Sequence, residues 1–192
     1  MLYGWQAGAA GGTVDASRDH QKESANMKYT IGLDFGTNSV RAVVAQTSDG
    51  AIAGSSVFEY PHGDMGVVID PKDPNLARQH PADWLAGIEA TVCAALSEAG
   101  PGVADGVVGI GVDTTGSTPV PVDAAGEALA LKDAFADNPN AMGWLWKDHT
   151  AYKEAAEITT AAAGTHPEYL AKCGGTYSSE WFWAKLLRCA RG

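Results

Sequence analysis

The sequence predicts an α/β domain whose sheet opens with an antiparallel meander. Three strand-like runs cover residues 28–35, 39–46 and 51–60, separated by the turn signals Gly-Thr-Asn and Ser-Asp-Gly. A helical pattern at about 81–99 precedes a short apolar run at 107–113. Because three adjacent strands come before the first helix, the order excludes a simple Rossmann βαβ start. We therefore expect a mixed sheet flanked by helices.

The first predicted helix has clear end signals. Pro81 suits the first helical position, and Gly100-Pro101 supplies the stop. Its apolar residues recur at helical spacing, so we expect them to face the core. This stripe consists of Trp84, Leu85, Ile88, Val92, Ala95 and Leu96.

The segments around this helix are expected to differ in character. Residues 62–76, rich in Gly, Pro and Asp, predict a long surface loop. The run 107–113 predicts a buried central strand, and 119–131 a hairpin that turns at 123–126. Further helices are expected at 150–163 and from Ser178 or Ser179 onward.

Composition limits the classes of protein to which this chain can belong. The 192 residues are enough for one domain with a core, and the 45% hydrophobic and 19% charged residues are typical of globular proteins. No apolar run is long enough to cross a bilayer. The net charge of -10 argues against nucleic-acid and membrane-surface binding, which require basic surfaces. Three widely spaced cysteines predict free thiols in a reducing cytoplasm, and the histidine spacing predicts no metal site.

The first 26 residues are expected to lie outside the folded domain. They have no basic start and no good apolar stretch, so they do not resemble a signal peptide. Their polar, aperiodic second half is typical of a disordered leader. Met27 directly precedes the first strand, so we interpret residues 1–26 as a leader or a misassigned start.

The strongest candidate site lies at residues 31–41, where the first strand turns into the second. Gly36 permits close approach of a ligand, and successive N–H groups in such a turn form an anion-binding nest. Asp34 is a candidate to hold Mg²⁺ through water, because hard cations take oxygen ligands. An ordinary hairpin is the alternative, but the combined side chains favour a phosphate site. The candidate phosphate-binding residues are Asp34, Thr37, Asn38, Ser39 and Arg41.

A second candidate segment follows the strand at 107–113. Asp113 and the small polar residues 114–118 come at the carboxyl end of this strand, where open α/β sheets build ligand sites. Hydroxyls and exposed backbone there suit a polyol better than an apolar ligand. A solvated strand-to-loop turn is the alternative, and this segment alone does not decide between them.

Two aromatic-rich segments complete the candidate site. Trp146, beside Lys147 and Asp148, combines a flat apolar surface with donors and acceptors, as sugar sites do. The alternative is that this tryptophan is core and Asp148 or Thr150 caps the next helix. Residues 174–185 are mainly structural in this interpretation, and Tyr177 is kept as the functional residue there. A G-x-S-x-G elbow and a Walker A loop are both absent.

Residues 31–41, 109–123, 138–151 and 174–187, in this order, closely resemble the ribulokinase branch of the FGGY carbohydrate kinases. The resemblance covers residues 28–188. The first motif is shared by the wider sugar kinase, actin and Hsp70 superfamily. The later LWKDHTA and YSSEWFWAK motifs are more particular to the ribulokinase branch.

This resemblance implies a ribonuclease-H-like (actin-like ATPase) fold, with ATP and sugar meeting between two such domains. It implies phosphoryl transfer from MgATP to a ketopentose hydroxyl, giving L-ribulose 5-phosphate in arabinose catabolism. Residues 27–192 then correspond to the N-terminal part of the first domain, with its sugar-binding side and first phosphate loop. The substrate-binding residues implied are Gly116, Ser117, Trp146, Lys147, Asp148 and Tyr177.

The resemblance also implies that part of the site is missing. Members of the family are more than twice as long, and their catalytic aspartate lies in a stretch beyond Gly192. We therefore expect the chain to lack appreciable kinase activity without the missing C-terminal domain, because phosphoryl transfer needs the complete site. A homodimer is one assembly that the resemblance allows for the full-length enzyme. Two alternatives remain open: a kinase for another sugar or polyol, and a non-catalytic actin-like nucleotide-binding module.

Overall fold

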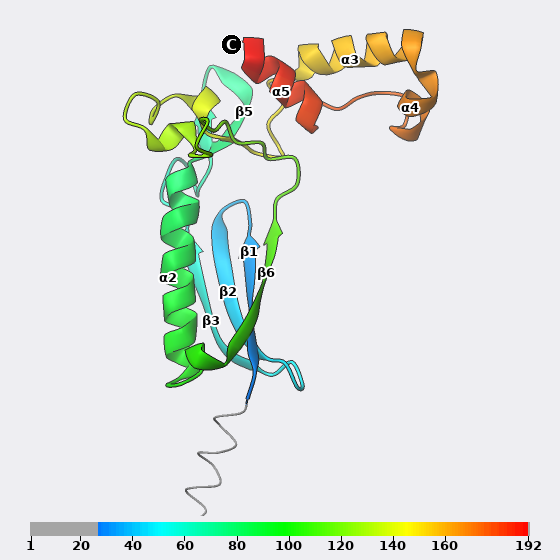
Figure 1. Cartoon of the computed structure of the whole chain (residues 1–192). Helices are drawn as coiled ribbons and strands as arrows, with labels where there is room; N and C mark the ends of the chain where they lie inside the picture. Colours follow the sequence, from blue (N-terminus) through cyan, green and yellow to red (C-terminus); the bar gives the residue numbers. More distant parts are fainter. Residues whose placement is uncertain (1–26, 192) are drawn as a thin grey trace, which may run out of the picture.

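The computed structural model describes residues 27–191, so the expected leader at residues 1–26 lies outside the described residues. The main sheet has four strands in the order β3-β2-β1-β6 (Figure 1). β1 (Tyr29–Phe35), β2 (Ser39–Gln46) and β3 (Ile52–Glu59) form the antiparallel meander, and β6 (Val107–Thr114) pairs parallel with β1. The predicted mixed sheet and its opening meander are confirmed.

One face of this sheet is covered by helix α2 (Pro81–Ala99), whose predicted ends are confirmed. His80 caps its N-terminus, because the imidazole Nδ1 accepts a hydrogen bond from the Ala82 N–H at 3.2 Å. The helix lies against β2 and β3, and every second residue of the strands faces it. The resulting core contains Tyr29, Ile31, Leu33, Ala42, Val44, Ala95 and Val103.

The side of α2 that faces the sheet matches the predicted apolar stripe only in part. Its buried line runs through Asp83, Gly87, Thr91 and Ala95, whereas Leu85 is 58% exposed. Helix and sheet approach each other too closely for larger side chains. A β-carbon at Gly87 would lie 2.5 Å from a methyl group of Val40. Small residues therefore occupy the contact line, and three predicted residues flank it and are partly buried: Ile88, Val92 and Leu96.

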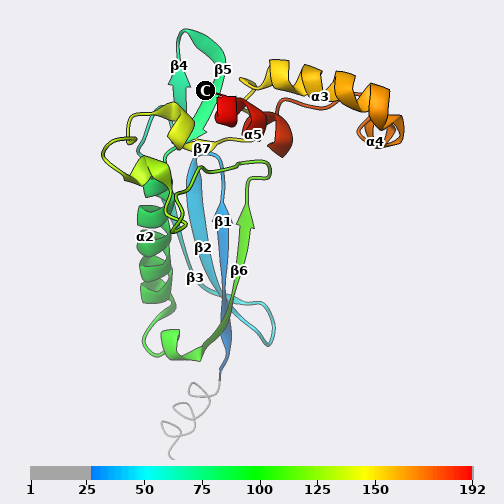
Figure 2. The same cartoon turned by 45° about the horizontal axis from the view of Figure 1, so that its top comes forward.

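The segment predicted as a long loop contains two strands, so that prediction was wrong. β4 (Val68–Asp70) and β5 (Asp73–Gln79) form an antiparallel hairpin, and β7 (Gly143–Trp144) pairs with β5 to complete a second sheet (Figure 2). The tight turn is closed by the Asp70 carboxylate, which accepts from the Lys72 N–H at 2.9 Å. Pro71 lies in this turn, and Pro74 lies where the register between β4 and β5 is broken, which explains why the pattern resembled a loop.

The predicted central strand also differs from the structure, because β6 lies at the edge of the sheet. Pairing with Ile31 and Leu33 places Ile110 and Val112 on the face that α2 covers. However, α2 lies over β2 and β3, and both side chains remain about 60% exposed: 62% for Ile110 and 61% for Val112. Within residues 27–191, therefore, the apolar face of β6 is uncovered.

The remaining elements lie beyond the carboxyl ends of β1 and β6 (Figures 1 and 2). The predicted hairpin at 119–131 is reduced to a single bridge between Val122 and Ala128. The three helices are α3 (Tyr152–Thr165), α4 (Pro167–Lys172) and α5 (Phe182–Arg191). None of the helices between residues 27 and 191 is both long and apolar enough to span a membrane.

The close contact between α2 and the sheet predicts the effect of adding one methyl group. A β-carbon at Gly54 would lie 2.2 Å from the Ala95 carbonyl oxygen, whereas one at Gly111 would meet no atom within 4 Å. We expect Gly54→Ala to lower the free energy of unfolding by ~1–3 kcal/mol through overpacking. Gly111→Ala should change it little. Urea denaturation of both variants tests this, and equal stabilities would contradict the packing described.

Candidate functional site

One buried side chain fixes the turn between β1 and β2. The Gln79 amide, 1% exposed at the end of β5, donates to the carbonyls of Gly36 at 3.0 Å and Thr37 at 2.8 Å. A trans peptide group directs its C=O and N–H oppositely. The N–H groups of Thr37 and Asn38 therefore point away from Gln79. Two adjacent N–H groups with this orientation can receive an anion.

The side chains of this turn have separate tasks. The Asn38 side chain was predicted to donate a hydrogen bond to phosphate. Instead, its amide N–H donates to the Met65 carbonyl and so connects the turn to the loop after β3. The Asn38 carbonyl accepts from the Tyr60 N–H at 2.9 Å. The Gly36 N–H closes the turn on the Ser39 carbonyl at 2.9 Å. The Asn38 side chain thus shapes the turn in this structure.

A row of charged side chains crosses the sheet on the face opposite α2. Asp113, Asp34 and Arg41 are register partners on β6, β1 and β2. The Arg41 guanidinium lies 3.4 Å from the Asp34 carboxylate, and both are about half exposed: 54% and 52%. Asp34 and Asp113 offer the hard oxygen ligands that Mg²⁺ takes. The residues therefore fit the expected cation, although residues 27–191 contain no group of three or more potential His, Cys, Asp or Glu ligands.

Trp146, predicted from a distant segment, lies directly beside the β1–β2 turn. Its indole N–H donates to the Thr37 hydroxyl at 3.1 Å, across 109 residues of sequence. The Trp146 residue is 44% exposed, and the neighbouring Lys147 is exposed too. An aromatic surface therefore adjoins the turn that is the candidate anion site.

The loop after β6 reaches the same region. The Thr115 N–H donates to the Phe35 carbonyl at 3.2 Å, which carries the chain from β6 across the end of β1. Gly116 and Ser117 are exposed, and Ser117 has a left-handed backbone with a φ of 52°. This conformation is uncommon for a residue other than glycine and costs of the order of 1 kcal/mol. A residue in this conformation needs support from neighbouring contacts.

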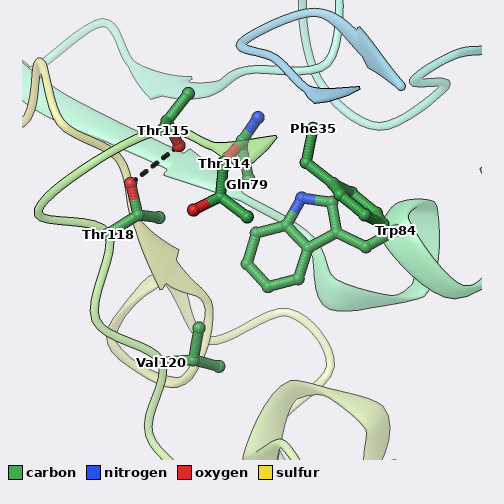
Figure 3. Close-up of a pocket in the computed structure, with 7 residues that line it drawn as sticks. All are labelled: Phe35, Gln79, Trp84, Thr114, Thr115, Thr118 and Val120. Atoms are coloured by element: carbon green, nitrogen blue, oxygen red, sulfur yellow. Dashed lines mark hydrogen bonds between the residues drawn. The ribbon is translucent and has the colours of Figure 1, made fainter. Parts of the chain in front are cut away.

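A hollow of about 310 Å³ opens under this loop (Figure 3). Thr115 and Thr118 join hydroxyls at 3.0 Å on one side, while Trp84 and Val120 make the other walls apolar. Such mixed lining suits a small ligand with hydroxyls and C–H faces. The lining residues are Phe35, Gln79, Trp84, Thr114, Thr115, Thr118 and Val120.

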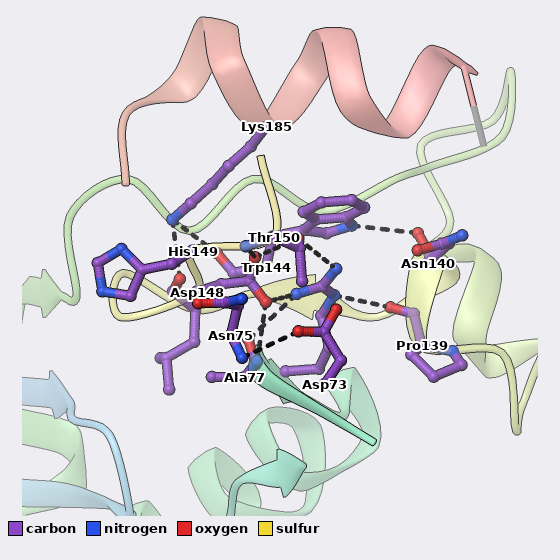
Figure 4. A network of polar contacts seen from close by, with 12 residues as sticks. Asp73, Asn75, Ala77, Pro139, Asn140, Trp144, Asp148, His149, Thr150 and Lys185 are labelled. Atoms are coloured by element: carbon purple, nitrogen blue, oxygen red, sulfur yellow. Dashed lines mark hydrogen bonds and ion pairs between the residues drawn. The ribbon is translucent and has the colours of Figure 1, made fainter. Parts of the chain in front are cut away.

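Asp148, predicted to bind substrate, is instead fully buried (Figure 4). Its carboxylate pairs with Arg78 and accepts from the Ala77 N–H at 2.8 Å and the Thr150 N–H at 3.0 Å. The Arg78 guanidinium also lies 3.6 Å from the ring centre of Trp144. Buried charges need such partners, because desolvation is costly. The structure therefore gives Asp148 a scaffold role, and its burial leaves the carboxylate no access to a ligand.

Tyr177 is placed away from the β1–β2 turn. Its N–H donates to the Thr159 hydroxyl at 2.9 Å, and its ring meets Trp181 edge-on at 4.9 Å. Its hydroxyl accepts from the Trp183 N–H at 3.3 Å. The tyrosine thus packs between α3 and the start of α5 and lines a separate hollow. Among the described contacts, none joins it to Trp146.

The site contains residues that the sequence did not reveal. Gln79 is the clearest case, because it lies between the predicted loop and the predicted helix and reaches a turn more than 40 residues away. The only available signal was a run of polar residues before Pro81. Thr115 and Thr118 were part of a predicted segment but were not singled out.

Solved structures with this arrangement define the class of protein. The chain resembles a xylulose kinase from Brucella ovis with a TM-score of 0.65 and 25% identity, covering 85% of this chain and 29% of that one. It also resembles Plasmodium falciparum glycerol kinase with ADP, with a TM-score of 0.60, 13% identity, and 87% and 29% coverage. The fold is thus the actin-like ATPase fold of FGGY-type carbohydrate kinases, and the predicted ribonuclease-H-like fold is confirmed.

Sequence relatives narrow this class to one branch. Over 84% of its length the chain is 44% identical to ribulokinase from Vibrio parahaemolyticus, and over 83% it is 40% identical to ribulokinase from Geobacillus thermodenitrificans. The chain spans 29% and 28% of these relatives. No protein-family model matches. The resemblance to the ribulokinase branch of the FGGY carbohydrate kinases, inferred from the motifs, is confirmed.

The position of Gln79 predicts how the β1–β2 turn responds to substitution. Gln79→Leu leaves two carbonyls without their donor, which costs about 1–3 kcal/mol and frees the turn to rotate. We expect the affinity of the turn for an anion, measured by calorimetry with inorganic pyrophosphate, to fall about tenfold. Gln46→Leu, at the far end of β2, is the matched control and should bind normally. Equal affinities of the two variants would show that Gln79 does not contribute to anion binding.

The buried pair of Arg78 and Asp148 predicts a large loss of stability when one charge is removed. Asp148→Asn leaves the guanidinium buried and uncompensated, which typically costs about 3–5 kcal/mol. Asp133→Asn changes an exposed carboxylate and should stay within about 0.5 kcal/mol of the unmodified chain. Chemical denaturation measures both. A small effect of Asp148→Asn would show that the pair is not a main support of the scaffold.

Proposed function

We propose that this chain provides the sugar-binding and first phosphate-binding parts of an ATP-dependent ribulokinase. The complete reaction would transfer the terminal phosphoryl group of ATP to L-ribulose and give L-ribulose 5-phosphate. Residues 27–192 would form the N-terminal part of the first of two kinase domains. Ribulokinase relatives at 37–44% identity support this substrate over other sugars.

The observation that carries the proposal is the hydrogen bond between Trp146 and Thr37. It brings an exposed aromatic ring, suited to the C–H face of a sugar, against a turn suited to phosphate. Phosphoryl transfer requires the acceptor hydroxyl and the phosphate chain to be positioned together.

The residues of the chain would divide the two ligands between them. The N–H groups of Thr37 and Asn38, with Ser39 and Arg41, would bind ATP phosphates. Asp34 would hold Mg²⁺ through water, and the metal would neutralise charge that develops on the transferred phosphoryl group. The sugar would lie between the loop at Gly116 and Ser117 and the ring of Trp146, with Lys147 on the adjoining segment.

We further infer that the chain alone does not catalyse transfer. It spans 29% of the Vibrio relative, and its described residues present only one side of a site that needs opposing groups. The chain should bind sugar but should not phosphorylate it. This separates binding, which the chain's own residues supply, from catalysis.

A binding experiment tests the proposal directly. Calorimetry with L-ribulose, D-xylulose and glycerol should show saturable binding that is tightest for L-ribulose. Trp146→Ala should weaken it by about tenfold or more, because a stacking surface is lost. A coupled assay of ADP release should show no turnover with MgATP.

Two results would overturn the proposal. Failure to bind any sugar, with the fold intact by circular dichroism, would remove the sugar-binding role proposed for this chain. ATP-driven polymerisation without sugar binding would instead favour a non-catalytic actin-like module. Family-like ADP release by the chain alone would contradict only the inferred inactivity.

A further inference from the structure

Lys185 is a fully buried lysine that no part of the proposed reaction uses. It extends from α5 with 0% exposure (Figure 4), and its ammonium donates to the carbonyls of Ser117 at 2.7 Å and Leu145 at 2.8 Å. The carbonyls of Trp144 and Trp146 lie at 3.4 and 3.5 Å. A single nitrogen thus gathers carbonyls from two segments that are far apart in the sequence.

Keeping a cation at this place is costly. Between residues 27 and 191, no carboxylate lies within ion-pair distance of the Lys185 ammonium. Burial lowers the pKa of Lys185 to about 8, with the Arg78 charge acting in the same direction and Glu180 opposing it. The protonated form therefore depends on backbone carbonyls for compensation. An apolar side chain would fill the same space at lower cost, unless the contacts themselves are needed.

The contacted carbonyls belong to both walls of the proposed sugar site. Ser117 is in the loop after β6, where its left-handed φ of 52° must be held by neighbouring contacts. Leu145 and Trp146 belong to the segment whose indole N–H reaches Thr37. One ammonium therefore contacts both the loop after β6 and the segment that carries Trp146.

We propose that Lys185 is a positioning residue that fixes the loop at 115–118 against the Trp146 platform, so that the sugar site is formed before the sugar binds. Its ammonium contacts only backbone in this role and does not touch substrate. The sugar-binding half of this inference rests on the proposed function. The geometric half, the fixed relation of Ser117 to Trp146, does not.

A simple anchor for α5 is the competing explanation. Removing an anchor would lower stability and loosen the helix, but it would leave the Ser117 and Trp146 geometry unchanged once the chain is folded. A positioning role predicts local changes at these two residues in a chain that remains folded. The two explanations therefore differ in a spectroscopic signature at named atoms.

The test compares Lys185→Met, which keeps the length but removes the donors, with Lys172→Met, which alters an exposed lysine on α4. In ¹³C,¹⁵N-labelled chain, we expect Lys185→Met to shift the carbonyl carbons of Ser117 and Leu145. It should also speed hydrogen exchange of the Trp146 indole N–H about tenfold, as expected when a local network is lost. The Trp84 indole, on α2, and all signals in Lys172→Met should stay unchanged.

Sugar affinity forms the second arm. If the unmodified chain binds L-ribulose, Lys185→Met should weaken binding about tenfold, whereas Lys185→Arg, which retains a charged donor, should recover part of that loss. If the unmodified chain binds no sugar, the proposed function fails, and the carbonyl and indole signals still decide the geometric inference.

The unmodified chain keeps the inference testable if Lys185→Met does not fold. The Lys185 ammonium should then give a ¹⁵Nζ resonance protected from solvent exchange, with through-space contacts to Ser117 and Leu145, while Lys172 shows neither. An unprotected Lys185 ammonium would overturn the inference. Unchanged Ser117 and Trp146 signals in a folded Lys185→Met chain would do so as well.

Discussion

Three consecutive residues at the end of β5 join the two sheets, and the site depends on this junction. Because side chains alternate along a strand, Arg78 points one way and its neighbours Ala77 and Gln79 the other. Arg78 enters the buried pair with Asp148, and the Ala77 N–H donates to the same carboxylate. Gln79 reaches the β1–β2 turn. The β1–β2 turn and the aromatic segment are therefore oriented from one short stretch of backbone.

This junction is built from charges that are expensive to bury. Arg78 and Asp148 compensate each other, whereas Lys185 is compensated by carbonyls alone. Such networks contribute little net stability when complete, but they tolerate few alternative arrangements because any partial arrangement leaves a charge unpaired. The described residues beyond the carboxyl ends of β1 and β6 form only small clusters of apolar residues. Polar geometry, more than apolar packing, defines the relative positions of its segments.

The parts that sequence could predict are those encoded locally. The meander, the ends of α2 and the turn at residues 36–39 each depend on neighbours within a few positions, and their patterns were sufficient. Gln79 and Lys185 could not be found this way, because their partners lie 42 and 68 residues away along the chain. Asp148 was assigned to a ligand because a carboxylate beside an exposed tryptophan resembles a sugar site. Only three-dimensional contacts show that its oxygens are already used.

The sequence pattern is wrong about the burial of β6 for a different reason from its errors at the site. An alternating apolar strand predicts burial, and the pairing of Ile110 with Ile31 directs it to the correct face of the sheet. The pattern carries no information about which element supplies the cover, and α2 is too far across the sheet to do so. The loop that leaves β6 nevertheless has a defined shape, because Thr115 is tied to Phe35 and Ser117 to Lys185. Order in this loop therefore comes from contacts beyond the end of the strand.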